Sequence, residues 1–100
     1  MFTGIIETVG EVEQIKKEGN NIIFTIKSKI SCELKIDQSL SHDGVCLTVV
    51  ESGPSNFSVA IIPYTYEHTN FKSLNIGSTV NIEFDMIGKY IAKLIKSSRD

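Results

Sequence analysis

The sequence contains no tryptophan and only two cysteines. With so few cysteines, a disulfide-stapled scaffold and a cysteine-rich metal site are not expected. Cys32 and Cys46 have no CxxC spacing and no pair of histidines beside them, so two reduced thiols in a cytosolic protein are expected. His42 and His68 lie far apart in the sequence and lack the spacing of metal ligands, so no metal site is predicted. Motifs of nucleotide-binding loops and hydrolase elbows are also missing.

An excess of positive charge and long hydrophobic runs are lacking as well. The net charge is −2 and the basic residues are scattered, which argues against nucleic acid, because phosphate contacts need clustered Lys and Arg. No run approaches the roughly 18 apolar residues of a membrane span, and the first ten residues lack the pattern of a secretory signal. A cytoplasmic protein without nucleic-acid or membrane partners is therefore expected.

What the sequence does contain is a series of short strand patterns separated by turn residues. A chain of 100 residues with 41% hydrophobic content fits one domain with a small core, which oligomerisation would help to stabilise. Six short strands with regular turns indicate an all-β domain, either a small closed barrel or a sandwich. The expected strands cover residues 9–15, 22–28, 38–42, 45–50, 57–62 and 79–84.

Three features of the connections complete this prediction. Pro63 is expected to end the fifth strand, and residues 65–71 fit either one helical turn or a loop. After Asp85 the period changes to that of a helix, which predicts a short amphipathic helix over residues 86–97. Its apolar stripe includes Ile87, Ile91 and Leu94, which serve either to pack on the barrel or to join subunits.

Candidate site residues are concentrated near the strand VCLTVV. Strand alternation places Cys46 and Thr48 on one face, opposite the aliphatic residues of the same strand. Cys46 is then either a small buried hydrophobic residue or, together with Ser39 and Thr48, part of the lining of a binding groove. The His-Asp pair at residues 42–43 is expected to be solvated turn chemistry. Thr65 can cap a turn or bind a ligand, and Asp85 can cap a helix or face a site.

Two stretches, MFTGIIE at residues 1–7 and DGVCLTV at residues 43–49, resemble the two characteristic motifs of riboflavin synthase of the alpha-chain type and of the lumazine proteins. The resemblance covers nearly the whole chain. It implies a six-stranded antiparallel Greek-key barrel over residues 1–85, followed by a C-terminal helix at 86–97 that makes a homotrimer. Each such barrel binds one 6,7-dimethyl-8-ribityllumazine, and the enzyme transfers a four-carbon unit between two of these molecules to give riboflavin and a diaminopyrimidine, without metal or organic cofactor.

The resemblance also implies roles for individual residues. Ser39 and Thr48 would bond the ribityl chain or the ring, while backbone groups of Ala60 and Ile62, with Thr65, would bond the pyrimidine edge. The residues with implied catalytic roles are Phe2, reaching over a partner's site, Cys46, aiding addition at the ring, and Asp85, aiding proton transfer. Ile5 and Ile6 would begin the first strand.

One departure from the family pattern limits the catalytic part of the prediction. A full family chain has two barrels, whereas this one resembles the first half of the N-terminal barrel joined, from about Phe57, to the second half of the C-terminal barrel. The histidine segment between the barrels is missing. Two functions therefore stay open: lumazine dismutation by paired subunits, with a trimer favoured over a dimer, or lumazine and flavin binding without catalysis.

Overall fold

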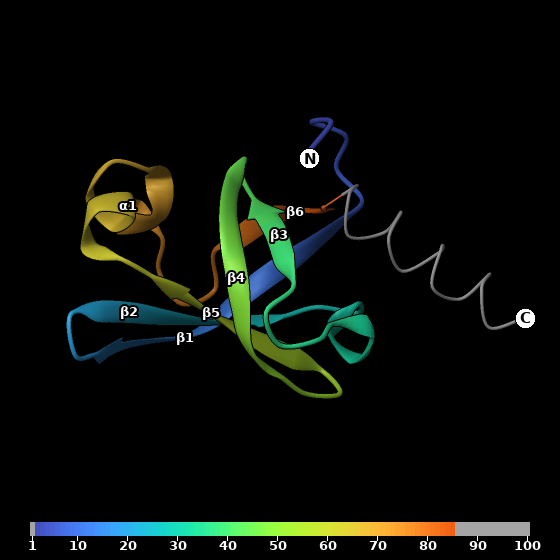
Figure 1. The fold of residues 1–100 in the computed structure, drawn as a ribbon, viewed down its shortest axis with the longest axis horizontal. Coiled ribbons are helices and arrows are strands. Elements are labelled where there is room, and N and C mark those ends of the chain that lie inside the picture. Colours follow the sequence, from blue (N-terminus) through green and yellow to red (C-terminus); the bar gives the residue numbers. More distant parts are fainter. Residues whose placement is uncertain (1, 86–100) are drawn as a thin grey trace, which may run out of the picture.

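The computed structural model describes residues 2–85, with the backbone alone at Cys32. Its strands form one closed barrel with the order β1-β2-β5-β4-β3-β6, and all neighbouring strands are antiparallel (Figure 1). The strands are β1 (Thr8–Glu18), β2 (Asn21–Lys27), β3 (Ser39–His42), β4 (Val45–Ser52), β5 (Asn56–Ile61) and β6 (Thr79–Phe84).

The strand order is that of a Greek key. Strands β3, β4 and β5 follow one another as neighbours, and β6 returns by a long connection to pair with β3. The six-stranded antiparallel Greek-key barrel expected for this chain is therefore confirmed. Ile5 and Ile6 do not begin the first strand, however, because β1 starts at Thr8, and their side chains are 70% and 46% exposed.

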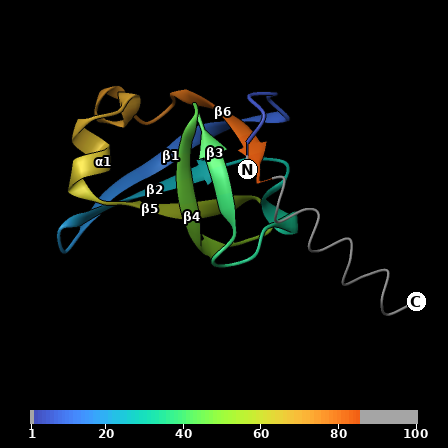
Figure 2. The same cartoon turned by 45° about the horizontal axis from the view of Figure 1, so that its top comes forward.

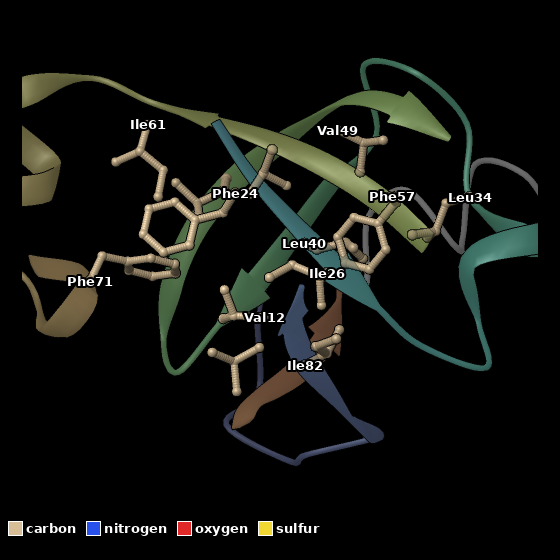
Figure 3. Close-up of a cluster of buried hydrophobic side chains, with 13 residues drawn as sticks. Val12, Phe24, Ile26, Leu34, Leu40, Val49, Phe57, Ile61, Phe71 and Ile82 are labelled. Atoms are coloured by element: carbon tan, nitrogen blue, oxygen red, sulfur yellow. The ribbon is translucent and has the colours of Figure 1, made fainter. Parts of the chain in front are cut away.

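The core follows from alternation along the strands. Every second side chain of β2, β4 and β5 points into the barrel, so apolar residues at these positions pack together and leave water (Figure 3). The buried cluster consists of Val12, Phe24, Ile26, Leu34, Leu40, Leu47, Val49, Phe57, Val59, Ile61, Phe71, Val80 and Ile82.

Short helices lie in the two long connections. The turn η1 (Ser31–Glu33) lies between β2 and β3, and α1 (Pro63–Glu67) and η2 (Asn70–Ser73) lie between β5 and β6. Pro63 ends the fifth strand as expected and occupies the first turn of α1, where its missing N–H costs nothing. Phe71 of η2 is fully buried and meets Phe24 edge-on, with 5.1 Å between ring centroids. Residues 65–71 thus combine one helical turn with a buried aromatic residue that covers this side of the core.

The expected C-terminal helix at 86–97, with Ile87, Ile91 and Leu94, lies outside the described residues. Between Phe2 and Asp85, no helix is long and apolar enough to cross a membrane.

Candidate functional site

The outer face of β3, β4 and β5 carries a row of small side chains. Ser39 pairs with Thr48, and Thr48 pairs on its other side with Ala60. Thr48 is exposed, whereas Ser39 and Ala60 are half-buried. The three residues therefore lie side by side across three strands, about 5 Å apart from strand to strand. Two hydroxyl groups and a methyl group make this row flat, uncharged and able to form a few placed hydrogen bonds.

Cys46 lies in the neighbouring row of the same face. It pairs with Ser41 of β3, and its thiol is exposed, while Leu47 and Val49 point into the core. This exposure excludes the interpretation of Cys46 as a small buried hydrophobic residue. It leaves the thiol beside Thr48 on the surface, as the groove interpretation requires.

The start of α1 borders this face at the end of β5. Ile62 follows β5 two residues after Ala60 and is 55% exposed, and Thr65 is half-buried in the first turn of α1. Next to them the rings of Tyr64 and His68 stack, with 4.1 Å between centroids, and the His68 ring nitrogen Nδ1 lies 2.8 Å from the Tyr64 carbonyl oxygen. This end of the face is thus more apolar and aromatic than the row of hydroxyl groups.

We define the ligand patch as Ser39, Cys46, Thr48 and Ala60 on the outer face of the barrel, together with Ile62 and Thr65 at the end of this face where α1 begins. All six are uncharged. Ala60 lies in a strand that is paired on both sides, to Ile23 of β2 and to Thr48 of β4, so its backbone lies within the barrel's hydrogen-bonded ladder. The Ala60 side chain alternates outward between the buried side chains of Val59 and Ile61, so it lies on the same face as Thr48.

The N-terminal residues approach the patch from the opposite side. Figures 1 and 2 place them beside β3 and β6, whereas α1 lies at the far end of the barrel. Phe2 is half-buried, and Asp85, just past β6, is half-buried too. The structure thus brings Ser39, Cys46, Thr48 and Ala60 onto one surface, with Phe2 and Thr65 on opposite sides of it.

Two hollows in the described surface differ in their relation to the patch. One of about 280 Å³ adjoins it and is lined by Glu18, Asn21, Ile23, Val50, Glu51 and Ala60. The larger, of about 510 Å³, is lined by none of the expected site residues but by Val9, Gly10, Glu11, Lys27, Ser28, Lys29, Pro54, Ser55 and Thr79. The larger hollow also carries the hydroxyl groups of Ser28, Ser55 and Thr79, but its lining includes three charged residues, Glu11, Lys27 and Lys29, whereas the candidate site residues on the outer face of β3, β4 and β5 are uncharged.

His42 corrects the prediction of solvated turn chemistry, whereas Asp43 lies in the turn as expected. His42 is fully buried because it alternates inward with Leu40 on β3. Asp43 forms the β3–β4 turn with φ 51°, and its carboxylate accepts hydrogen bonds from the backbone N–H of Asn81 and the side chain of Asn70, each 2.8 Å. Both residues therefore serve the barrel and lie apart from the patch chemistry.

The comparison with protein families decides the family of this barrel. Residues 3–85 match the model of the lumazine binding domain. The chain belongs to the lumazine-binding domain family. The residues of the patch lie within the matched range, as do the six strands.

Relatives of this lumazine-binding domain include riboflavin synthases from bacteria and yeast. The chain is 42% identical over 84 residues to the riboflavin synthase of Bacillus subtilis, covering 83% of this chain and 39% of that protein. It is 39% identical to the enzyme of Actinobacillus pleuropneumoniae over 100% of this chain and 48% of the relative. For Schizosaccharomyces pombe the identity is 34%, over 94% of this chain and 47% of the relative. The domain thus spans less than half the length of each of these relatives.

Solved structures give the same picture. LumP in complex with riboflavin superimposes with a TM-score of 0.77 at 25% identity, covering 86% of this chain and 47% of LumP. LumP in complex with 6,7-dimethyl-8-(1'-D-ribityl) lumazine gives a TM-score of 0.75 at 26% identity, covering 84% of this chain and 47% of LumP. A single barrel of this lumazine-binding domain therefore corresponds to about half of each neighbour.

Sequence reasoning missed one carboxylate that the structure places beside the patch. Glu83 has the spacing of an outward residue on β6, which predicts exposure, but it is only 4% exposed. It pairs with Ser41, which in turn pairs with Cys46, so it lies in the same row as the thiol. Its burial depends on contacts with residues 3 and 4, about 80 positions away, and nothing local in the sequence signals that contact.

Proposed function

We propose that this domain binds 6,7-dimethyl-8-ribityllumazine or riboflavin on the ligand patch. The ring lies against Cys46, and the hydroxyl groups of Ser39 and Thr48 bond the ribityl chain or the ring. Backbone groups of Ala60 and Ile62, with Thr65, bond the pyrimidine edge, because a carbonyl oxygen in the strand ladder keeps a second lone pair for a ligand. The ligand is bound as substrate or cargo, and the proposal includes no metal or further cofactor.

The chemistry of the patch supports this choice of ligand. A lumazine or flavin ring is planar, uncharged and bordered by hydrogen-bonding groups, so it suits a flat surface with a few placed polar groups. The six patch residues carry hydroxyl, thiol, methyl and aliphatic groups without a formal charge. The row Ser39–Thr48–Ala60 on the outside of a family barrel is the observation that carries the proposal.

A fluorescence titration of the purified chain with riboflavin tests the binding. We expect saturable quenching of flavin fluorescence, and the same experiment with the ribityllumazine compares the two ligands. A dissociation constant far above millimolar for both would reject the proposal, provided that circular dichroism shows a folded barrel.

The second candidate function is dismutation of two lumazines to riboflavin by paired subunits. The sequence identity to riboflavin synthases over most of this chain favours it. Two barrels would hold the ligands face to face, and the rate would come mainly from proximity and orientation. An assay for riboflavin formed from lumazine, with Cys46→Ser and Phe2→Ala as variants, separates the two functions. Turnover that both variants reduce supports dismutation, whereas ligand binding without turnover supports a binding module.

Self-association is part of the proposal, because dismutation needs two sites. Exposed apolar side chains support it: Ile5, Ile6 and Val9 lie close together in sequence and are 70%, 46% and 52% exposed. A surface of this kind is stabilised when a second copy covers it. We favour a trimer over a dimer, with Ile87, Ile91 and Leu94 contributing to the interface. The molar mass from light scattering tests this, and the mass of a monomer at all micromolar concentrations would reject both assemblies.

A further inference from the structure

Glu83 is a carboxylate buried on the outer side of the barrel. Along β6, Val80 and Ile82 point into the core, so Glu83 faces outward, where a carboxylate is normally solvated. Its side chain is nevertheless covered, with 4% of the residue exposed. A carboxylate taken out of water needs hydrogen-bond donors in exchange.

The N-terminal segment, residues 2–4, supplies these donors. The backbone N–H and the hydroxyl of Thr3 both donate to Oε2 of Glu83, the hydroxyl at 2.7 Å, and the N–H of Gly4 donates to Oε1 at 2.9 Å. Gly4 has φ 84°, a left-handed conformation that glycine adopts without strain and that turns consecutive N–H groups toward one anion. The Thr3 hydroxyl and backbone hold the pKa of Glu83 below its ordinary value of 4.5.

This contact fixes where the N-terminal segment lies. Glu83 pairs with Ser41, and Ser41 pairs with Cys46, so the carboxylate lies in the Cys46 row at a distance of two strand spacings, roughly 10 Å. The segment held by Glu83 therefore borders the ligand patch, and Phe2, next to Thr3, is half-buried at this border. Figure 2 shows the N-terminal residues beside β3 and β6.

We propose that Glu83 is the positioning residue for Phe2: its carboxylate holds residues 2–4 so that the Phe2 ring stays at the Cys46 side of the ligand patch. The part of this proposal that concerns ligand affinity rests on the proposed function. The anchoring of Thr3 and Gly4 by Glu83 is independent of any ligand.

Amide spectra of the ¹⁵N-labelled full chain test the anchor. In the wild type we expect the Thr3 and Gly4 amides to be shifted downfield, protected from exchange and responsive to acid in parallel with the Glu83 carboxylate. Glu83→Gln removes the negative acceptor and should abolish all three properties, while Thr3→Val should weaken them. Glu11→Gln, an exposed carboxylate on β1 away from the patch, is the matched control. Unchanged Thr3 and Gly4 amides in Glu83→Gln would overturn the anchor.

Riboflavin titration tests the positioning of Phe2. We expect Glu83→Gln to raise the dissociation constant about tenfold, as for the loss of a hydrogen bond to a charged group, with no change for Glu11→Gln. Phe2→Ala should weaken binding too, and the double variant should be no weaker than Phe2→Ala alone, because both act through one contact. Additive losses would overturn the positioning role. A wild type that binds neither riboflavin nor lumazine while its amides show the anchor would reject the proposed function and leave the anchor supported.

Discussion

The imidazole ring of His42 packs against the ring of Phe57 inside the barrel, with 5.6 Å between their centroids. Phe71 borders the same imidazole from another side, 6.4 Å away. Neither ring nitrogen of His42 has a hydrogen-bond partner among the described residues. Burial therefore lowers the pKa of His42 from 6.5 to about 4, and the backbone of Leu40 and the carboxylate of Asp43 offset this only in part.

The first prediction is a loss of stability on mild acidification. The unfolded chain takes up a proton on His42 near pH 6.5, but the folded chain does so only near pH 4, so acid favours the unfolded state across this interval. We expect the free energy of unfolding to fall by about 3 kcal/mol from pH 7 to pH 4 through this group. Urea unfolding at pH 7, 6, 5 and 4 measures it.

His42→Leu is the control for this effect. It should remove most of the pH dependence between 6.5 and 4, whatever it does to stability at pH 7. The lowered pKa of Glu83 acts in a lower window: its contribution is present above pH 4.5 and is lost as the pH falls through its folded value. Equal pH slopes in His42→Leu and the wild type between pH 6.5 and 5 would contradict the assignment.

The second prediction concerns a close approach in the barrel wall. A Cβ on Gly10 would lie 2.5 Å from Cγ2 of Ile26 and 2.9 Å from Cδ1 of Ile82. Gly10→Ala should therefore lower the free energy of unfolding by about 1–3 kcal/mol, measured by denaturant titration. Gly53→Ala is the control, because its Cβ would approach no atom more closely than 3.4 Å, and it should change stability by less than about 0.5 kcal/mol. Equal losses in the two variants would argue against a clash at Gly10.

The third prediction concerns the β3–β4 turn. Asp43→Ala removes the acceptor of two hydrogen bonds and places alanine at φ 51°, so we expect a loss of about 2 kcal/mol in the free energy of unfolding. Asp43→Asn keeps one side-chain oxygen and tolerates the left-handed conformation, so its loss should be smaller. Thermal melting measures the midpoint temperature of each variant, and we expect that of Asp43→Asn to be the higher. A lower midpoint for Asp43→Asn than for Asp43→Ala would contradict the structural role of the carboxylate.

The fourth prediction concerns the ligand patch. Thr48→Val keeps the shape of the side chain but removes its hydroxyl, so the dissociation constant for riboflavin should rise about fivefold while stability changes little at this exposed position. Thr79→Val is the matched control, because Thr79 is an exposed strand threonine of β6 that borders the larger hollow instead. If both variants bind riboflavin with the affinity of the wild type, the proposed role of the Thr48 hydroxyl in binding is rejected.

Much of this fold could be read from the sequence, because the signals are local. The alternation of Cys46, Leu47, Thr48 and Val49 predicts which side chains of β4 face the core, and the structure confirms it. The turn at residues 43–44 joins β3 and β4, as the expected strands at 38–42 and 45–50 require. In each case the deciding residues are neighbours in the chain.

The features that sequence reasoning missed depend on distant contacts. His42 follows the same alternation, but its polarity suggested solvent, and only the rings of Phe57 and Phe71 show that it lies in the core. Glu83 is covered by residues 3 and 4, which no local pattern connects to β6. Burial of a polar side chain is set by what the fold places over it, and that is information about tertiary structure.

The seam between β1 and β6 has a consequence for how the chain folds. Gly10 pairs with Val80, and the hydroxyl of Thr3 reaches Glu83 across 80 positions of sequence. Contacts of such separation cost the most chain entropy and set a slow pace of folding. We therefore expect the pairing of β1 with β6 to form last, after the β3–β4–β5 meander. Until β6 arrives, β1 presents an unpaired edge, so the barrel is most prone to aggregate before its own last strand is in place.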